Sequence, residues 1–138
     1  MLKPGGRFIF SVWDRISANE FADVVSDAVA ACFPDDPPKF LSRAPYGYHD
    51  ATRLRDELRS AGFGQVSVET IEHRSRAPGP GDPAIGFCQG SPLRAEIEAR
   101  DADRLMAVTK AATDAIATRF GSGPVEARIQ AHVITATP

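Results

Sequence analysis

The chain has 138 residues, which is enough for one domain with a core of its own. Charged residues make up 25% of the chain and the formal net charge is −2, so the composition gives no electrostatic reason to expect nucleic acid or an anionic membrane as a partner. No apolar stretch approaches the ~18 residues that a membrane span needs, and no signal-peptide core is recognisable. Two cysteines without a disulfide or ligand pattern favour a cytoplasmic protein.

The opening segment predicts a turn followed by a strand over 7–14. Pro4 and the two glycines after it stop any preceding helix and supply a sharp turn. The run Phe8–Trp13 is apolar apart from Ser11, which is typical of a strand covered on both faces. Such a strand at the start of a chain leaves an edge that something else must cover, so the sequence is expected to begin in the middle of a domain.

Helical periodicity, breakers and alternation predict the remaining elements of a single partial domain over 1–138. Ser17-x-x-Glu20 reads as a capping box, Asp50 as an N-cap and Gly62 as a left-handed C-terminal residue. Ile71 is out of phase with the alternation that starts at Gln65, which indicates either a bulge or burial on both faces. In chain order we expect a strand over 7–14, a helix over 18–33, a lid-like loop over 34–50, a helix over 51–61, a strand over 65–73, a connection with helices over 75–120 and a strand over 125–136.

The segment Leu2-Lys3-Pro4-Gly5-Gly6-Arg7, followed by Phe8-Ile9-Phe10-Ser11-Val12-Trp13-Asp14, resembles the entry to the fifth strand of class I S-adenosylmethionine-dependent methyltransferases. The resemblance is to the ubiquinone/menaquinone-type small-molecule branch and extends through Tyr46-Gly47-Tyr48-His49-Asp50 and Ala61-Gly62-Phe63 to the last strand. It implies an α/β fold, namely the C-terminal half of a Rossmann-like methyltransferase fold. That half has a small mixed sheet of about three strands, with the last strand antiparallel and inserted between the other two, and helices packed on it.

In the resembled family, a glycine-rich turn after the first strand and an acidic residue after the second hold S-adenosylmethionine. The present sequence has no such turn after a strand: its glycine clusters lie before the first strand, in a proline-rich connection and after a helix. We therefore expect no cofactor-binding residue in this chain. No metal site is expected either, because the three histidines and two cysteines lack ligand spacing.

The resemblance places candidate substrate-binding residues at the end of the first strand and in the lid-like loop. They are Trp13, Asp14, Tyr46, Tyr48 and His49. His49 is also the candidate for removing a proton from the acceptor, because imidazole titrates near neutral pH. The alternative is that Trp13 packs under the lid and Asp14 caps the turn. His73 and His132 are expected to be ordinary residues on the polar faces of strands.

These observations predict a methyltransferase-like protein whose family transfers a methyl group to a small-molecule acceptor, but which lacks the cofactor half and is inactive alone. The alternative is a non-enzymatic module derived from that fold, which associates with itself or with a partner. In either case the exposed strand edge predicts a homodimer or a complementing N-terminal half, with no nucleic acid and no membrane as partner.

Overall fold

The computed structural model describes residues 2–138, which form an α/β arrangement of a three-stranded sheet and six α-helices. The strands are β1 (Phe8–Trp13), β2 (Gln65–Ala77) and β3 (Val125–Thr137). The helices are α1 (Glu20–Cys32), α2 (Phe40–Arg43), α3 (Ala51–Ser60), α4 (Gly81–Gly90), α5 (Leu93–Arg100) and α6 (Leu105–Phe120), and a short 3-10 turn (Ile16–Ala18) precedes α1.

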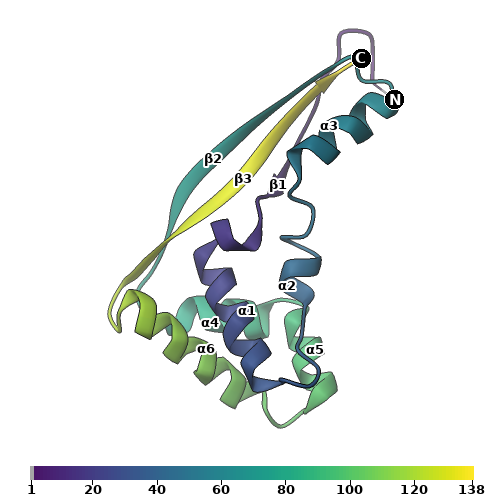
Figure 1. Cartoon of the computed structure of the whole chain (residues 1–138). Helices are drawn as coiled ribbons and strands as arrows, with labels where there is room; N and C mark the ends of the chain where they lie inside the picture. Colours follow the sequence, from purple (N-terminus) through teal and green to yellow (C-terminus); the bar gives the residue numbers. More distant parts are fainter. Residues whose placement is uncertain (1) are drawn as a thin grey trace.

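The last strand lies in the middle of the sheet, in the order β1-β3-β2 (Figure 1). It runs antiparallel to both neighbours, which confirms the prediction for this strand. The sheet is not mixed as predicted, because both of its pairings are antiparallel. A mixed sheet needs adjacent parallel strands, and β1 and β2, which share a direction, are kept apart by β3.

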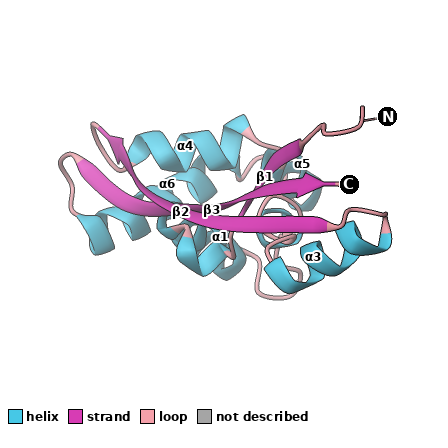
Figure 2. Cartoon of the chain, turned by 90° about the horizontal axis from the view of Figure 1, so that it is seen from above, coloured by secondary structure: helices cyan, strands magenta, loops and turns pink. Residues whose placement is uncertain are grey.

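The helices cover the two ends of the sheet unequally. The helices α1, α4, α5 and α6 gather at the end where β2 ends and β3 begins, whereas α3 lies beside the end that carries the C-terminus (Figures 1 and 2). The main apolar core lies within the first group and includes Val25, Ile97 and Ile116 together with Val125 and Ala127 of β3. Most helices therefore pack on one another and on one end of β3, so the predicted packing of helices on the sheet is concentrated at that end.

The strand β1 is not covered on both faces. Phe8, Ile9 and Trp13 are 42%, 57% and 39% exposed, so the prediction of two covered faces is wrong for the residues described. The predicted edge is present, because β1 lies at the side of the sheet with β3 as its one strand neighbour in the described chain. An apolar run of this kind indicates that other segments pack on both faces of the strand, but it does not identify those segments.

The start of α1 differs from the predicted capping box. The helix begins at Glu20, and Ser17 lies in the preceding 3-10 turn. The Glu20 carboxylate instead accepts the Arg128 backbone N–H at 2.7 Å and the Arg119 guanidinium at 2.9 Å. These partners from β3 and α6 satisfy the carboxylate better than a local cap, since a charged acceptor forms its strongest bonds with charged or backbone donors.

The signals around α3 are confirmed. The Asp50 carboxylate accepts the backbone N–H groups of Thr52 and Arg53, which makes Asp50 the N-cap. Gly62 follows the helix with φ +102°, and the N–H of Phe63 donates to the carbonyl of Leu58 at 3.1 Å.

The connections contain more regular structure than predicted. The strand β2 extends to Ala77, and its register with β3 is unbroken, so there is no bulge. Ile71 is half-buried on the face opposite Val66 and Val68, in agreement with the alternative of burial on both faces. The helix α4 occupies most of the Pro- and Gly-rich stretch after β2, and α2 lies within the lid-like loop 34–50.

Candidate functional site

The end of β1 and the loop that leads into α3 form the region where the predicted site residues meet. Trp13 and Asp14 are consecutive, so their side chains leave the chain on opposite sides of the sheet. The loop residues Tyr48 and His49 are also consecutive. Tyr48 lines a hollow that includes Trp13, and His49 lines a second hollow that includes Asp14.

The first hollow is aromatic and has a volume of about 360 Å³. It is lined by Ser11, Val12, Trp13, Ala44, Pro45, Tyr48 and Ala131. Tyr46 supports Trp13 from the side, with the ring centroids 5.9 Å apart, and burial raises the pKa of Tyr46. Arg53 lies 5.4 Å above the Tyr48 ring. Flat rings of this kind bind apolar, planar molecules.

The second hollow is polar and has a volume of about 380 Å³. It is lined by Asp14, Arg15, His49, Asp50, Ala51, Thr52 and His132. The hollow lies between the sheet and the start of α3, so both the N-cap Asp50 and the strand residues face it. Two imidazoles, two carboxylates and a guanidinium thus line a space large enough for a small ring.

Asp14 is the centre of a hydrogen-bond network that ties β1 to β3. Its carboxylate accepts Gln130 Nε2 at 2.6 Å and the Arg15 backbone N–H at 2.7 Å, and His132 Nε2 lies 3.3 Å from it. Burial raises the pKa of Asp14, but the bond from Gln130, the bond from Arg15 and the charges of His132 and Arg15 together hold it below its ordinary value. Asp14 is therefore a carboxylate at neutral pH.

Asn19 fixes the backbone beneath Asp14. Its side-chain NH₂ donates to the carbonyls of Asp14, Arg15 and Gln130, each at 3.2 Å. Its side-chain oxygen accepts the Gln130 N–H at 2.9 Å. Because Asn19 is fully buried, these bonds stabilise one geometry of the turn after β1.

His132 belongs to the site, although the sequence predicted an ordinary polar-face residue. It is only 7% exposed, and its Nδ1 lies 2.9 Å from Thr70 Oγ1. Gln130, Thr70 and Asn19 were also missed. The alternation along β3 puts His132 and Gln130 on one face, but only the register with β1 and β2 reveals that Asp14 and Thr70 flank His132.

His49 lies at the rim of the polar hollow, and its Nδ1 is buried without a hydrogen-bond partner among the described residues. A buried polar atom without a partner is unfavourable by about 1–3 kcal/mol, and ligand binding can remove this cost. The Nδ1 of His49 is thus free to bond a molecule in this hollow, and the role of His49 in binding stays a prediction. His73 is exposed on β2.

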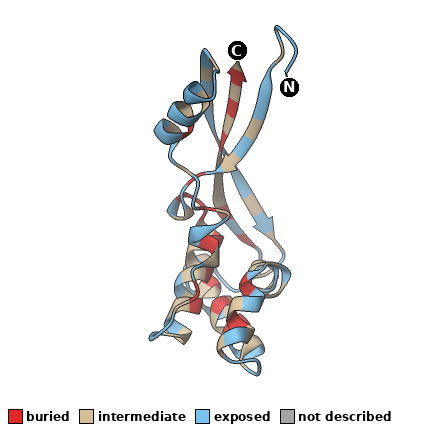
Figure 3. Ribbon diagram, turned by 90° about the vertical axis from the view of Figure 1, so that its right-hand side faces the viewer, coloured by how far each residue is buried: buried red, intermediate tan, exposed pale blue. Residues whose placement is uncertain are grey.

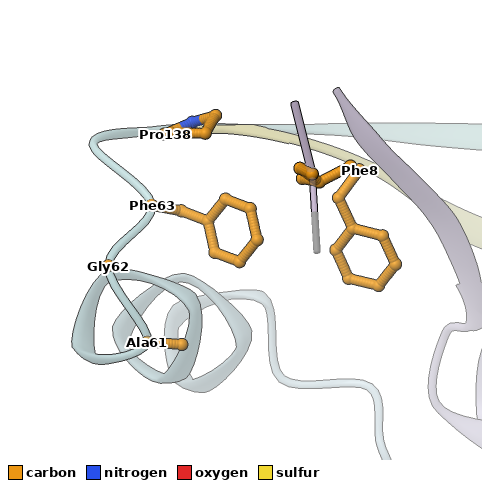
Figure 4. A pocket seen from close by; sticks show the side chains of 6 residues that line it. Phe8, Ala61, Gly62, Phe63 and Pro138 are labelled. Atoms are coloured by element: carbon orange, nitrogen blue, oxygen red, sulfur yellow. The ribbon is translucent and has the colours of Figure 1, made fainter. Parts of the chain in front are cut away.

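A third hollow carries no such chemistry. It has a volume of about 670 Å³ and lies at the other end of β1. There the ring of Phe8 lies opposite the ring of Phe63, beside Pro138 and the end of α3 (Figure 4). Its lining residues are Leu2, Phe8, Ala61, Gly62, Phe63 and Pro138, and none of these side chains titrates.

Within residues 2–138, no group of three or more histidine, cysteine or acidic side chains is arranged to hold a metal ion. Cys32 and Cys88 are free thiols, and burial raises the pKa of Cys88 to about 11. None of the helices formed by these residues is both long and apolar enough to cross a membrane.

No protein-family model matches this chain, and no curated protein sequence matches it.

Proposed function

We propose that this chain is the acceptor-binding part of a class I S-adenosylmethionine-dependent methyltransferase fold. In this proposal it binds a small molecule that receives a methyl group, while the cofactor is held by strands that the present sequence does not contain. The chain alone neither binds S-adenosylmethionine nor transfers a methyl group.

The observation that carries the proposal is the position of the last strand. In the methyltransferase fold, the final strand enters the sheet antiparallel between two strands that share a direction. The order β1-β3-β2 has this arrangement, with α3 and β2 lying between β1 and β3 in the chain. The opening motif before β1 and the order of elements support the same assignment.

The free edge of β1 supports the presence of further strands in the complete fold. The Asp14 N–H donates to the Gln130 carbonyl at 3.0 Å. Since antiparallel pairing alternates, the even-numbered residues of β1 direct their backbone groups toward β3. The N–H and C=O groups of Ile9, Ser11 and Trp13 therefore point away from the sheet, where an added strand can pair with them.

The acceptor is expected at the carboxyl end of β1, since open α/β sheets bind ligands beyond the carboxyl ends of such strands. A flat apolar acceptor fits the aromatic hollow beside Trp13 and Tyr48, whereas a small polar acceptor fits the separate hollow beside Asp14, His49 and His132. Methyl transfer needs alignment of acceptor, methyl group and sulfur more than it needs strong acid or base groups.

Calorimetric titration with S-adenosylmethionine tests the proposal. We expect no saturable heat for the 138-residue chain and saturable binding when the chain is expressed together with the in-frame coding region directly upstream of Met1. Binding by the 138-residue chain alone would contradict the proposal. So would an extended protein that folds but does not bind.

A second candidate function is self-association through the same edge. The segment Phe8–Trp13 contains no charged residue that would discourage pairing between chains. A two-fold axis through Ser11 places Ile9 opposite the second copy's Trp13, and each copy then offers its outward backbone groups to the other. Light scattering distinguishes the two candidates: a dimer without any upstream segment favours self-association, and a stable monomer excludes it.

A further inference from the structure

The lid-like loop and the sheet together form the wall of the aromatic hollow. The loop contributes Ala44, Pro45 and Tyr48. The sheet contributes Ser11, Val12, Trp13 and Ala131. A molecule bound in this hollow would contact both parts of the structure, so its affinity depends on the position of the loop relative to the sheet.

Glu96 of α5 holds the middle of the lid-like loop. Its Oε2 accepts the Phe40 backbone N–H at 3.0 Å, and its Oε1 lies 3.4 Å from Nη1 of Arg43. Phe40 and Arg43 are the first and last residues of α2, so one carboxylate fixes both ends of this short helix. Arg100, also on α5, donates to the Glu96 carbonyl at 2.8 Å and to the Asp36 carboxylate at 3.2 Å. The helix α5 thus anchors the loop at two places.

The last part of the loop folds tightly onto α2. The Tyr46 N–H donates to the Leu41 carbonyl at 3.1 Å. A Cβ added at Gly47 would lie 2.1 Å from the carbonyl oxygen of Arg43, so the backbone approaches α2 more closely than any other residue type allows. Because α2 and the residues up to Gly47 form one unit, a shift of α2 also moves Tyr48, which follows directly in the chain.

The contacts that keep the loop in place are of two kinds. The Arg43 and Asp36 side chains are 65% and 78% exposed, and ion pairs of exposed side chains contribute little to stability. Tyr46, by contrast, is buried, and its ring lies against Trp13 with the centroids 5.9 Å apart. Moving the loop away would expose both rings to water, which favours the closed position. The anchoring bonds to α5 can therefore open and close while the hydrophobic contact returns the loop to the sheet.

We propose that the lid-like loop closes as a lid on a flat apolar molecule in the aromatic hollow, and that Glu96 is the positioning residue that holds it closed. The closed loop supplies part of the wall, so a bound molecule favours closure, and binding weakens in proportion when fewer chains are closed. The inference rests on the proposed function, because it assumes that the aromatic hollow is a binding site. It involves neither S-adenosylmethionine nor transfer of a methyl group.

The test uses Trp13, the one tryptophan of the sequence, as reporter in the full 138-residue chain. Acrylamide quenching of its fluorescence measures opening, and its indole N–H signal in NMR follows the binding of quinoline, a flat bicyclic probe. Glu96→Ala should raise the quenching constant about twofold, since Trp13 is 39% exposed with the loop closed. The same change should weaken quinoline binding about tenfold. Glu96→Gln should have a smaller effect, because its amide oxygen still accepts the Phe40 N–H.

The matched control is Glu98→Ala on the same helix, since Glu98 bonds Arg94 of α5, and it should change neither readout.

A second measurement needs no variant to fold. In the unmodified chain, hydrogen exchange at the Phe40 amide should slow when quinoline is bound, although Phe40 does not line the hollow. Three results would overturn the lid: quinoline does not bind, Glu96→Ala binds it as tightly as the unmodified chain does, or Phe40 exchanges at the same rate with and without quinoline. None of these readouts involves S-adenosylmethionine, so a failed lid is distinguishable from a failed methyltransferase assignment.

Discussion

The helical end of the molecule buries its large apolar side chains, whereas the β1 side of the sheet leaves several of them exposed to solvent. Among the helices, Val25, Ile97 and Ile116 are inaccessible to solvent. Along β1, by contrast, large apolar side chains remain exposed, and Figure 3 shows this strand mostly pale blue beside a β3 that is buried or half-buried along most of its length. The comparison indicates that the helical end supplies most of the stability of the chain, whereas the β1 side leaves apolar surface exposed, which we propose contacts another segment.

The largest expected effect comes from opening a cavity at the helical end. Ile116→Ala should reduce the free energy of unfolding by about 2–5 kcal/mol, because the neighbouring buried residues cannot fill the space. Urea denaturation followed by circular dichroism measures this loss.

The matched change on the sheet is Ile9→Ala, which removes the same atoms from an exposed position. Its effect should stay within about 0.5 kcal/mol. Equal losses for the two variants would show that β1 is as well packed as the helices, and the contrast between the two regions would be wrong.

A smaller loss of folding stability is expected at the turn after β1, where the two regions are joined. Asn19→Ala removes an amide that satisfies three carbonyls and one N–H at the turn after β1, and should destabilise the chain by about 2 kcal/mol. The same urea experiment measures this loss. The control is Gln65→Ala at an exposed position, which should lower the free energy of unfolding by no more than about 0.5 kcal/mol. An Asn19 variant as stable as its control would remove the structural role assigned to this residue.

These contrasts also explain which parts of the structure the sequence could predict. Local signals sufficed for α3, because the Asp50 cap and the Gly62 turn depend on residues within a few positions of each other. Local signals gave the wrong partner for Glu20, because its carboxylate bonds Arg119 and Arg128, which come from distant elements. They also missed α4, because its glycines and proline are typical of a loop.

The candidate site was predictable only in part. The residues after β1 and in the lid-like loop follow from the resemblance, and they do lie together around two hollows. His132 and Thr70 were missed because their place beside Asp14 depends on the register of two strand pairs, and register is set by the whole sheet and not by local sequence.

The pH dependence of stability probes the polar hollow more finely. The pKa of Asp14 is lowered in the folded chain, so its ionised form stabilises the fold above the unfolded value of about 3.9, and this contribution is lost as the pH falls through the folded value. The unfolding free energies of the unmodified chain and Asp14→Asn should therefore differ most near neutral pH and converge in acid. A difference that is independent of pH would show that the Asp14 charge has no part in the network.

The smallest effect on stability is expected from Ser11→Pro. The Ser11 N–H points away from β3, so proline removes an outward donor without breaking a bond of the sheet. Any association through the β1 edge should weaken in light scattering, while the unfolding curve changes little. The control is Phe10→Pro, which removes an N–H that faces β3 and should destabilise the fold; equal damage from both changes would mean that the Ser11 amide is also paired.

The unpaired edge of β1 is tested most directly by amide hydrogen exchange, measured by NMR on the dilute, monomeric chain. We expect slow exchange at Phe10 and Val12, whose N–H groups face β3, and fast exchange at Ile9, Ser11 and Trp13, whose N–H groups face outward. Slow exchange at all five amides in the monomer would contradict an open edge and, with it, the proposal that further strands complete the sheet.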